Sequence, residues 1–153
     1  MKQSLRGEYL ALRKALLPAH RAEKSREICN GLLHLPALAY CKEIACYEAF
    51  PSEVDIRRFI EGSRAKIHIL SQKPDELTTR DFDAWIVPGI VFDKLGHRIG
   101  FGKGTYDRLL EKSAGLKIGV CFYCQISPTP LPRASHDVRM DILVTEEQVY
   151  SFL

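Results

Sequence analysis

The apolar positions in the first part of the chain recur with the spacing of a helix. Leu5, Leu12 and Leu16 fall on one side of a period of about 3.6 residues, and they predict an amphipathic helix that ends before Pro18. A second helix is expected over about 19–33, where the apolar residues again gather on one side. The chain is therefore predicted to open with two helices.

Beyond residue 42 the period changes, and short apolar runs predict strands. These runs are EIACYEA (43–49), KIHIL (66–70), AWIVPG (84–89), KIGVCF (117–122) and DILVT (141–145). Helices are expected at SEVDIRRFIEG (52–62), after a glycine-rich segment, and at EEQVYSFL (146–153). In the first of these, Ser52 and Asp55 have the spacing of a capping box, and Gly62 closes the helix.

The order of these elements predicts the fold class. Strands that alternate with helices form a largely parallel sheet with helices on both faces. We therefore expect an α/β fold with three αβα layers, a mostly parallel central sheet and two N-terminal helices. The chain has no internal repeat, no low-complexity segment and no long linker, so residues 1–153 are expected to form a single domain.

The segment RIGFGKGTYDR, from Arg98 to Arg108, has a glycine at every second position: Gly100, Gly102 and Gly104. Each glycine costs about 0.5–1 kcal/mol relative to alanine in a regular element, so three of them predict a close approach to the backbone. Thr105 stands where an N-cap would lie, and Leu109 and Leu110 begin an apolar helix face.

A glycine-rich loop before a helix offers free backbone N–H groups to an anion, and Arg98 and Lys103 add positive charge. This favours a phosphate ligand, while the alternative is a tight turn with solvated basic side chains. Two common phosphate motifs do not fit. The P-loop requires Ser or Thr after its lysine, but Gly104 follows Lys103, and the glycine spacing differs from that of the dinucleotide fingerprint.

The composition is that of an ordinary globular protein, with 46% hydrophobic and 27% charged residues. No apolar run approaches the roughly 18 residues of a membrane span, and the polar start is no signal peptide, so a cytoplasmic location without a membrane partner is expected. A net charge of +3 does not demand a nucleic-acid partner. We expect a monomer.

The cysteine pattern does not favour a metal site. An odd number, five, without a secretion signal predicts reduced thiols. Cys121 and Cys124 resemble half of a zinc site, with Cys41 and Cys46 as the other half. Residues three apart in a buried strand point to opposite faces, however, so we interpret these thiols as small buried hydrophobic groups.

The loops that follow the predicted strands are the candidate site, because ligands of open α/β sheets bind beyond the carboxyl ends of the strands. Glu53 lies in the loop after the first strand. Asp107 and Asp141 bracket the glycine-rich segment, and two carboxylates beside a phosphate site commonly hold Mg²⁺. On position alone, Asp107 can equally be a first-turn helix residue and Asp141 a strand-end turn residue.

Four segments spread over the chain resemble the 5-formyltetrahydrofolate cyclo-ligase family: KQSLR near the start, SEVD, VPGIVFDKLGHRIGFGKGTYDR and HDVRMDILVTE. The resemblance implies an enzyme that converts 5-formyltetrahydrofolate to 5,10-methenyltetrahydrofolate with ATP and Mg²⁺, through a phosphorylated formyl group. ADP and phosphate are released. Such chemistry depends on positioned cations and backbone N–H groups rather than on a covalent nucleophile.

The resemblance also implies roles for individual residues. It assigns Lys103 and Arg98 to catalysis and Asp107 and Asp141 to Mg²⁺. The residues that it assigns to ATP are Lys2, Arg6, Arg98, Gly100, Gly102, Lys103, Gly104 and Tyr106. Those that it assigns to the folate are Glu53, Phe101, Gly104 and Thr105, with Glu53 binding the pterin-like head.

The chain departs from the family pattern on the folate side. Family members usually have two tyrosines before Asp107, but here Thr105 stands at the first position. The family also typically carries a few dozen residues between the second and third strands, including a Gly-Ile-x-Glu-Pro motif, whereas the segment between Leu70 and Asp83 is short. The nucleotide half of the site looks complete and the folate half trimmed.

Three interpretations remain open at this stage. The first is an active cyclo-ligase with a minimal folate pocket. The second is a non-catalytic nucleotide-binding or regulatory protein, and the third is a related ATP-using enzyme with another formylated or carboxylated substrate. A basic N-terminal helix that binds RNA is a remoter option, which a steep salt dependence of binding would reveal.

Overall fold

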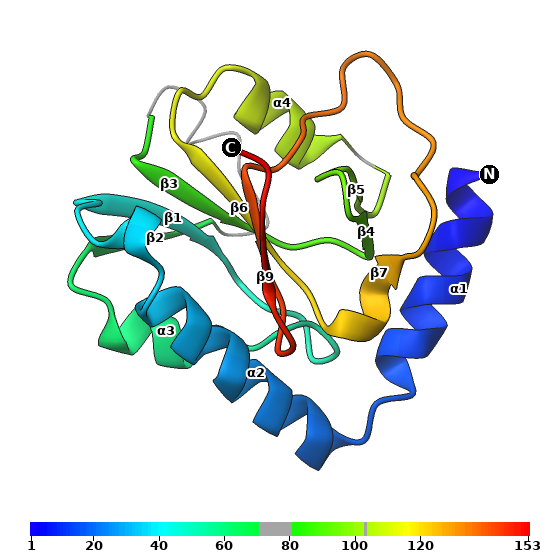
Figure 1. Ribbon diagram of the computed structural model, residues 1–153, viewed down its shortest axis with the longest axis horizontal. Coiled ribbons are helices and arrows are strands. Elements are labelled where there is room, and N and C mark those ends of the chain that lie inside the picture. The colour runs from blue at the N-terminus through cyan, green and yellow to red at the C-terminus, as the bar shows by residue number, and fades with distance from the viewer. Residues whose placement is uncertain (71–80, 103) are drawn as a thin grey trace.

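The computed structural model describes residues 1–70, 81–102 and 104–153. Its centre is a mixed sheet of six described strands in the order β2-β1-β3-β6-β8-β9 (Figure 1). The strands are β1 (Glu43–Tyr47), β2 (Lys66–Leu70), β3 (Ala84–Val87), β6 (Leu116–Val120), β8 (Ile142–Val144) and β9 (Val149–Ser151). In this order, each strand from β2 through β8 is parallel to the next, and only the last pair, β8 and β9, is antiparallel.

Helices cover both faces of this sheet. The described helices are α1 (Lys2–Lys14), α2 (Pro18–Leu33), α3 (Arg57–Gly62) and α4 (Thr105–Glu111), with short 3₁₀ turns η1 (Pro36–Leu38) and η3 (Tyr123–Gln125). Helices α2 and α3 lie on one face of the sheet and α4 on the other (Figure 1). Ile28 of α2 and Phe59 of α3 belong to one core cluster with Ile86, and Leu110 of α4 belongs to the other with Trp85. Successive side chains of β3 therefore belong to two different cores, one on each face of the sheet. The predicted three-layer α/β fold with its mostly parallel sheet and two N-terminal helices is confirmed.

A second, small sheet supports the glycine-rich loop and was not predicted. It consists of β4 (Val91–Asp93), β5 (Arg98–Ile99) and β7 (Ile126–Ser127), in the order β5-β4-β7. Its strands have two or three residues, which is too short for a periodicity to emerge from the sequence. Tyr9 of α1 packs on Val91 and Ile99, so the first helix rests on this sheet rather than on the central one.

The predicted helix at the C-terminal end is wrong, because the segment 146–153 contains the strand β9. Leu143 pairs with Tyr150 and Val144 with Val149. A tight turn closes this hairpin, since the Thr145 hydroxyl accepts a hydrogen bond from the Gln148 backbone N–H at 3.0 Å. Tyr150 and Phe152 both pack against the core, which is the two-residue period of a strand.

Two predicted helix caps are also wrong. Helix α3 begins at Arg57, with Ile56 as its N-cap, and the Ser52 hydroxyl instead accepts a hydrogen bond from Arg13 Nε at 3.2 Å. Helix α4 begins at Thr105 itself, and its N-cap is Gly104, whose φ of 65° is left-handed. In both places a tertiary contact or a backbone conformation decides where the helix starts.

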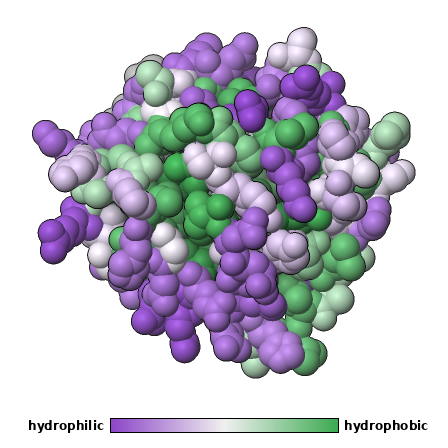
Figure 2. Space-filling view, viewed as in Figure 1, coloured by the Kyte–Doolittle hydropathy of each residue, from purple (hydrophilic) through white to green (hydrophobic). Residues whose placement is uncertain are grey.

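The surface on the side shown in Figure 2 carries patches of apolar residues between hydrophilic ones. Such exposure is ordinary, because apolar atoms contribute over half of the surface of folded proteins. None of the helices within the described ranges is both long enough and apolar enough to span a membrane.

We predict opposite effects of alanine at two glycines. A Cβ at Gly115, just before β6, would lie 2.1 Å from the Phe82 carbonyl oxygen, whereas a Cβ at Gly7 in α1 would have no neighbour within 4 Å. Gly115→Ala should therefore lower the free energy of unfolding by about 1–3 kcal/mol, and Gly7→Ala should raise it by about 0.5–1 kcal/mol. Urea unfolding followed by circular dichroism measures both free energies. Equal changes in the two variants would contradict the close approach of Gly115 to the Phe82 carbonyl oxygen.

Candidate functional site

A cavity of about 570 Å³ opens beyond the carboxyl ends of β1 and β3. Its walls come from the start of α1, the loop after β1, the glycine-rich loop, the start of α4 and the loop before β8. The predicted site residues among its lining are Lys2, Arg6, Glu53, Arg98, Gly100, Phe101, Gly102, Gly104, Thr105, Tyr106 and Asp107. These residues are far apart in the sequence, and the parallel sheet brings them together. Lys103, also predicted to lie here, is outside the described residues.

Helix α1 lies against the glycine-rich loop through Arg6. Arg6 Nε donates a hydrogen bond to the Gly100 carbonyl oxygen at 2.7 Å. The guanidinium also lies over Gly102, where a Cβ would be 3.1 Å from Arg6 Cζ, and the φ of Gly102 is +95°. Glycine is needed here for both reasons, since a side chain would strain the backbone and crowd the arginine.

Arg98 is buried beneath the same loop, with its side chain only 7% exposed. Its Nε donates a hydrogen bond to the Pro88 carbonyl oxygen at 2.8 Å, and its guanidinium carbon lies 5.3 Å from the centre of the Tyr106 ring. Burial lowers the pKa of Arg98, and Asp107, at 3.9 Å from Arg98 Nη1, opposes this shift. An arginine stays charged even so, which places a fixed positive charge at the base of the cavity.

Two carboxylates face these cations. Asp107 Oδ1 accepts a hydrogen bond from the Val138 backbone N–H at 3.1 Å. Asp137, the residue before Val138, forms an ion pair of 2.7 Å with Lys2 Nζ and also lines the cavity. The lysine and the hydrogen bond from the Ala134 N–H outweigh burial and lower the pKa of Asp137. Asp137 was not among the predicted site residues.

The structure does not bring Asp141 to this cavity. Its carboxylate accepts a hydrogen bond from the Lys117 N–H at 2.8 Å, and its backbone pairs with Lys117 and Phe152. Asp141 directly precedes β8, so it lies at the amino ends of the parallel strands, whereas the cavity lies at their carboxyl ends. This position was visible in the sequence: the aspartate adjoining the apolar run had to start the strand, and Asp137, four residues earlier, remained in the loop.

The donor set limits what metal the site could hold. The described residues contain no group of three or more His, Cys, Asp or Glu side chains arranged for a metal ion. Mg²⁺, however, is commonly held by one or two carboxylates together with substrate phosphates and water. Asp107 and Asp137 fit such an ion if a phosphate ligand brings the rest of its coordination.

Glu53 closes the other end of the cavity and is only 6% exposed. Its Oε1 accepts a hydrogen bond from the Phe50 N–H at 2.8 Å. Burial raises the pKa of Glu53, and the Phe50 N–H and the positive charges of Arg13 and Arg98 oppose this shift. A buried carboxylate with free lone pairs is suited to accept hydrogen bonds from a ligand with adjacent N–H groups.

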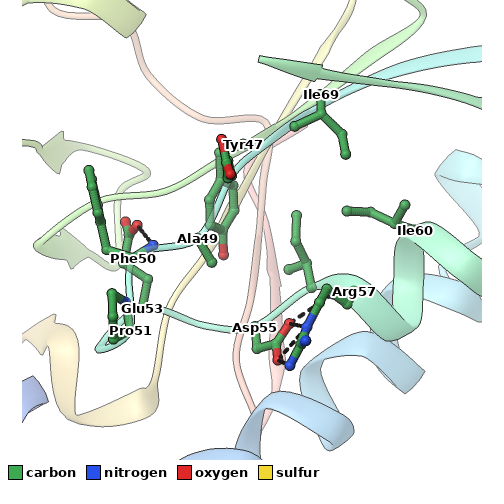
Figure 3. Close-up of a pocket in the computed structure, with 11 residues that line it drawn as sticks. Tyr47, Ala49, Phe50, Pro51, Glu53, Asp55, Arg57, Ile60 and Ile69 are labelled. Atoms are coloured by element: carbon green, nitrogen blue, oxygen red, sulfur yellow. Dashed lines mark hydrogen bonds and ion pairs between the residues drawn. The ribbon is translucent and has the colours of Figure 1, made fainter. Parts of the chain in front are cut away.

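A second cavity of about 590 Å³ adjoins the first (Figure 3). The two share Tyr47, Glu48, Phe50 and Glu53. Ile60 and Ile69 form the wall opposite Phe50 and Glu53, and the ion pair of Asp55 and Arg57, 2.6 Å apart, lies below them. Phe50 is partly exposed and makes an edge contact with Phe101, at 5.9 Å between ring centres. This end of the site is therefore apolar and aromatic around one buried carboxylate.

The two ends of the site suit different chemical groups. Lys2, Arg6 and Arg98 gather at the glycine-rich end, where phosphates are the natural ligands. Glu53 and the aromatic rings at the other end suit a planar heterocycle that donates hydrogen bonds. Both ends line one cavity.

A family model and several relatives identify the family of this chain. The model of the 5-formyltetrahydrofolate cyclo-ligase family matches residues 61–146. A structure of 5,10-methenyltetrahydrofolate synthetase from Aquifex aeolicus is similar over 99% of this chain and 92% of that chain, with a TM-score of 0.81 and 32% identity. The corresponding synthetase structure from Mycoplasma pneumoniae has a TM-score of 0.78 at 24% identity, over 95% and 98% of the two chains, and supports the fold.

One relative aligns with this chain over nearly the full length of both proteins. The 5-formyltetrahydrofolate cyclo-ligase of Mycoplasma pneumoniae is 27% identical over 164 aligned residues, which cover 95% of this chain and 99% of that protein. A short chain without long insertions is therefore found elsewhere under this name.

We predict that Gly102→Ala weakens the binding of inorganic tripolyphosphate about tenfold. Alanine disfavours the left-handed φ by roughly 1–2 kcal/mol, so we expect the free loop to relax and to regain its anion-binding conformation only at that cost. A cost of 1.4 kcal/mol on binding is about tenfold in affinity. The added methyl would also displace Arg6. Isothermal titration calorimetry gives the dissociation constant, with Gly7→Ala in the same helix as Arg6 as the control. An unchanged constant would show that the glycine-rich end does not bind the anion.

Proposed function

Because this chain belongs to the 5-formyltetrahydrofolate cyclo-ligase family, we propose that it converts 5-formyltetrahydrofolate to 5,10-methenyltetrahydrofolate with the hydrolysis of ATP to ADP and phosphate. The observation that carries this proposal is the single cavity that joins a cationic, glycine-rich end to a buried carboxylate with aromatic neighbours. These are the two kinds of surface that a nucleotide and a reduced folate require.

The glycine-rich end is proposed to bind the phosphates of ATP. Lys2 and Arg6 lie four residues apart in α1, so both project to the same side of the helix. They and Arg98 supply positive charge around the loop of Gly100, Gly102 and Gly104. Tyr106, whose ring lies on Arg98, forms the wall behind the phosphates.

Mg²⁺ is proposed to bind with the nucleotide at Asp107 and Asp137. When bound, such an ion neutralises charge on the phosphate oxygens during phosphoryl transfer. Asp137 is paired with Lys2 in the protein without ligands. With the nucleotide bound, a phosphate would interact with Lys2 and Asp137 would hold the metal. Each of the two side chains would then exchange its present partner for a ligand of the same sign of charge.

The folate is proposed to lie with its pterin against Glu53. The 2-amino group and the adjacent ring N–H of a pterin are neighbouring donors, which match the two oxygens of one carboxylate. Phe50, Phe101 and Thr105 would surround the ring, and the second cavity would receive the p-aminobenzoyl part (Figure 3). This arrangement directs the N5-formyl group toward the glycine-rich end.

The reaction then needs no covalent enzyme intermediate. The formyl oxygen attacks the γ-phosphorus of ATP and ADP leaves. The N10 lone pair attacks the activated formyl carbon, the carbon–oxygen bond breaks to release phosphate, and the N10 proton is lost as the ring closes. Charge builds on the transferred phosphoryl oxygens, which Arg98 is placed to stabilise. Lys103, outside the described residues, is assigned the same task by its family position.

The elements around the cavity support further proposals on organisation. The site draws on α1, on the loop after β1, on α4 and on the loop before β8, which supports a single domain over residues 1–153. We also propose a monomeric, cytoplasmic enzyme that acts on small molecules rather than on nucleic acid or membranes.

The first test of this function is turnover. Purified protein with Mg²⁺, ATP and 5-formyltetrahydrofolate should produce the absorbance of the methenyl product and one ADP for each product molecule. ADP release that does not depend on the folate would point to a different ATP-using enzyme. Binding of ATP without any turnover would instead support the nucleotide-binding, regulatory interpretation.

A matched pair of variants tests the metal site. Asp137→Asn should raise the Mg²⁺ concentration for half-maximal rate by roughly tenfold or more, the scale of losses that follow changes around metal ligands. Asp141→Asn should leave that concentration unchanged, because Asp141 lies at the opposite ends of the strands. A shift confined to Asp141→Asn would reverse our assignment.

A further inference from the structure

Arg13 is a buried charge whose purpose is not explained by the cavity. It lies in α1, is 2% exposed and lines neither cavity. An arginine at a core position is costly, because removing a charge from water is repaid only by good partners. Its surroundings therefore indicate what it serves.

The partners of Arg13 belong to the loop that carries Glu53. Arg13 Nε donates a hydrogen bond to the hydroxyl oxygen of Ser52 at 3.2 Å. Ser52 adjoins Glu53 in the chain, and Glu53 and Arg13 attract each other, each being first among the charges that act on the other. Glu53 in turn holds the Phe50 N–H at 2.8 Å, so the arginine, the serine and the carboxylate brace one short turn.

We propose that Arg13 is a positioning residue for the folate end of the site, which fixes the loop through Ser52 and supplies the positive charge that keeps the buried Glu53 ionised. The identity of the ligand rests on the proposed function, whereas the link between Arg13 and Glu53 does not. Arg13 touches no substrate in this proposal, and it acts through the carboxylate.

This proposal gives α1 two tasks. Arg6 and Arg13 are seven residues apart, close to two helical turns, so they project from the same side of α1 about 10 Å apart. Arg6 holds the glycine-rich loop and Arg13 holds the Glu53 loop. One rigid helix therefore sets the distance between the nucleotide end and the folate end, where the phosphoryl group must pass.

The charge of Arg13 should be visible in the pH dependence of folate binding. A protonated Glu53 loses acceptor capacity for the donors of a pterin. Burial already raises the pKa of Glu53, and Arg13 is one of two arginines that counteract it. Without Arg13 the pKa rises further, so that Glu53 becomes protonated at a higher pH as the pH falls, and folate binding weakens from that higher pH downward.

Other groups around Glu53 do not replace this charge. The charged or titratable groups that act on Glu53 or line its cavities are Arg98 of β5, Tyr47 of β1, Tyr106 of α4, Glu48 after β1, Asp55 before α3, Arg57 of α3, and Lys2, Arg6, Asp107, His136 and Asp137 at the nucleotide end. Burial raises the pKa of both tyrosines far above neutrality, so they stay uncharged. Of the basic residues, only Arg98 joins Arg13 among the charges that act on Glu53, and Arg98 is shared with Asp107.

The experiment compares variants that separate charge from packing. Arg13→Met removes the charge from a buried position, Arg13→Gln keeps polarity without charge, and Arg13→Lys keeps the charge. Arg21→Met is the matched control, since Arg21 donates to the Pro51 carbonyl oxygen of the same loop at 3.3 Å but is not among the charges that act on Glu53. Thermal melting establishes that each variant is folded before kinetics are measured.

For turnover, Arg13→Met and Arg13→Gln should raise the KM for 5-formyltetrahydrofolate about tenfold at neutral pH, the ratio that 1.4 kcal/mol represents. The KM for ATP should stay within a factor of two. The rise of the folate KM at low pH should begin at a higher pH than in the wild type. Arg13→Lys and Arg21→Met should both show the wild-type pH dependence of the folate KM.

A substrate-free measurement separates this proposal from the proposed function. Carbon-13 NMR of glutamate carboxyl groups, with Glu53 assigned through Glu53→Gln, should show Glu53 titrating at a higher pH in Arg13→Met or Arg13→Gln than in the wild type. This result supports the proposal even if the protein has no cyclo-ligase activity. An unchanged Glu53 titration in a folded variant that lacks the charge overturns it, whatever the activity.

Discussion

The contact between helix α1 and the glycine-rich loop positions one wall of this site. Arg6 donates to the Gly100 carbonyl oxygen and lies over Gly102, which has no Cβ to crowd the guanidinium. Tyr9 seats α1 on the small sheet of β4, β5 and β7, and the Arg6 contact brings the start of the helix to the loop, where it forms one wall of the cavity. Gly102 therefore serves the first helix as well as any phosphate that binds beside it.

Two of the three cations proposed to meet phosphates have a carboxylate beside them before any ligand arrives. Lys2 is paired with Asp137 and Arg98 is near Asp107, the two carboxylates proposed to meet Mg²⁺, whereas Arg6 donates to the Gly100 carbonyl oxygen. A nucleotide bound with its metal can replace these contacts one for one. This explains how a site with several buried charges remains stable when empty, since unpaired buried charges would be costly.

The other end of the cavity, which is proposed for the folate, is built differently: one buried carboxylate is surrounded by apolar and aromatic groups. Glu53 is held by the Phe50 N–H within its own loop and by the charge of Arg13 from outside it. The same helix thus supports both ends. If the two ends bind the two proposed ligands, a shared support would keep the reacting groups at a constant separation.

The sequence was a good guide wherever a periodic pattern was long. Hydrophobic spacing predicted the parallel strands and the first two helices. Most of the residues that the family resemblance assigned to the site do line one cavity. Short elements could not be predicted in this way. Strands β4, β5 and β7 have two or three residues, and the segment of the three-residue strand β9 was wrongly predicted as a helix. The caps at Ser52 and Thr105 failed because Arg13 and Gly104 decide those turns.

The choice of Asp141 over Asp137 shows why a motif alone does not place a side chain. Both aspartates belong to HDVRMD, and three residues lie between them. Asp137 stays in the loop beside Lys2, whereas Asp141 starts β8 at the other edge of the sheet. The strand direction, rather than the residue type, decides which carboxylate faces the cavity.

We propose that the cavity passes a phosphoryl group from ATP to the formyl oxygen of the folate. Substrate carrying oxygen-18 in the formyl group reveals this transfer through phosphorus-31 NMR of the inorganic phosphate formed in one turnover. We expect the label in phosphate, because the formyl oxygen leaves with it. Unlabelled phosphate, together with normal formation of the methenyl product, would exclude the phosphorylated formyl group.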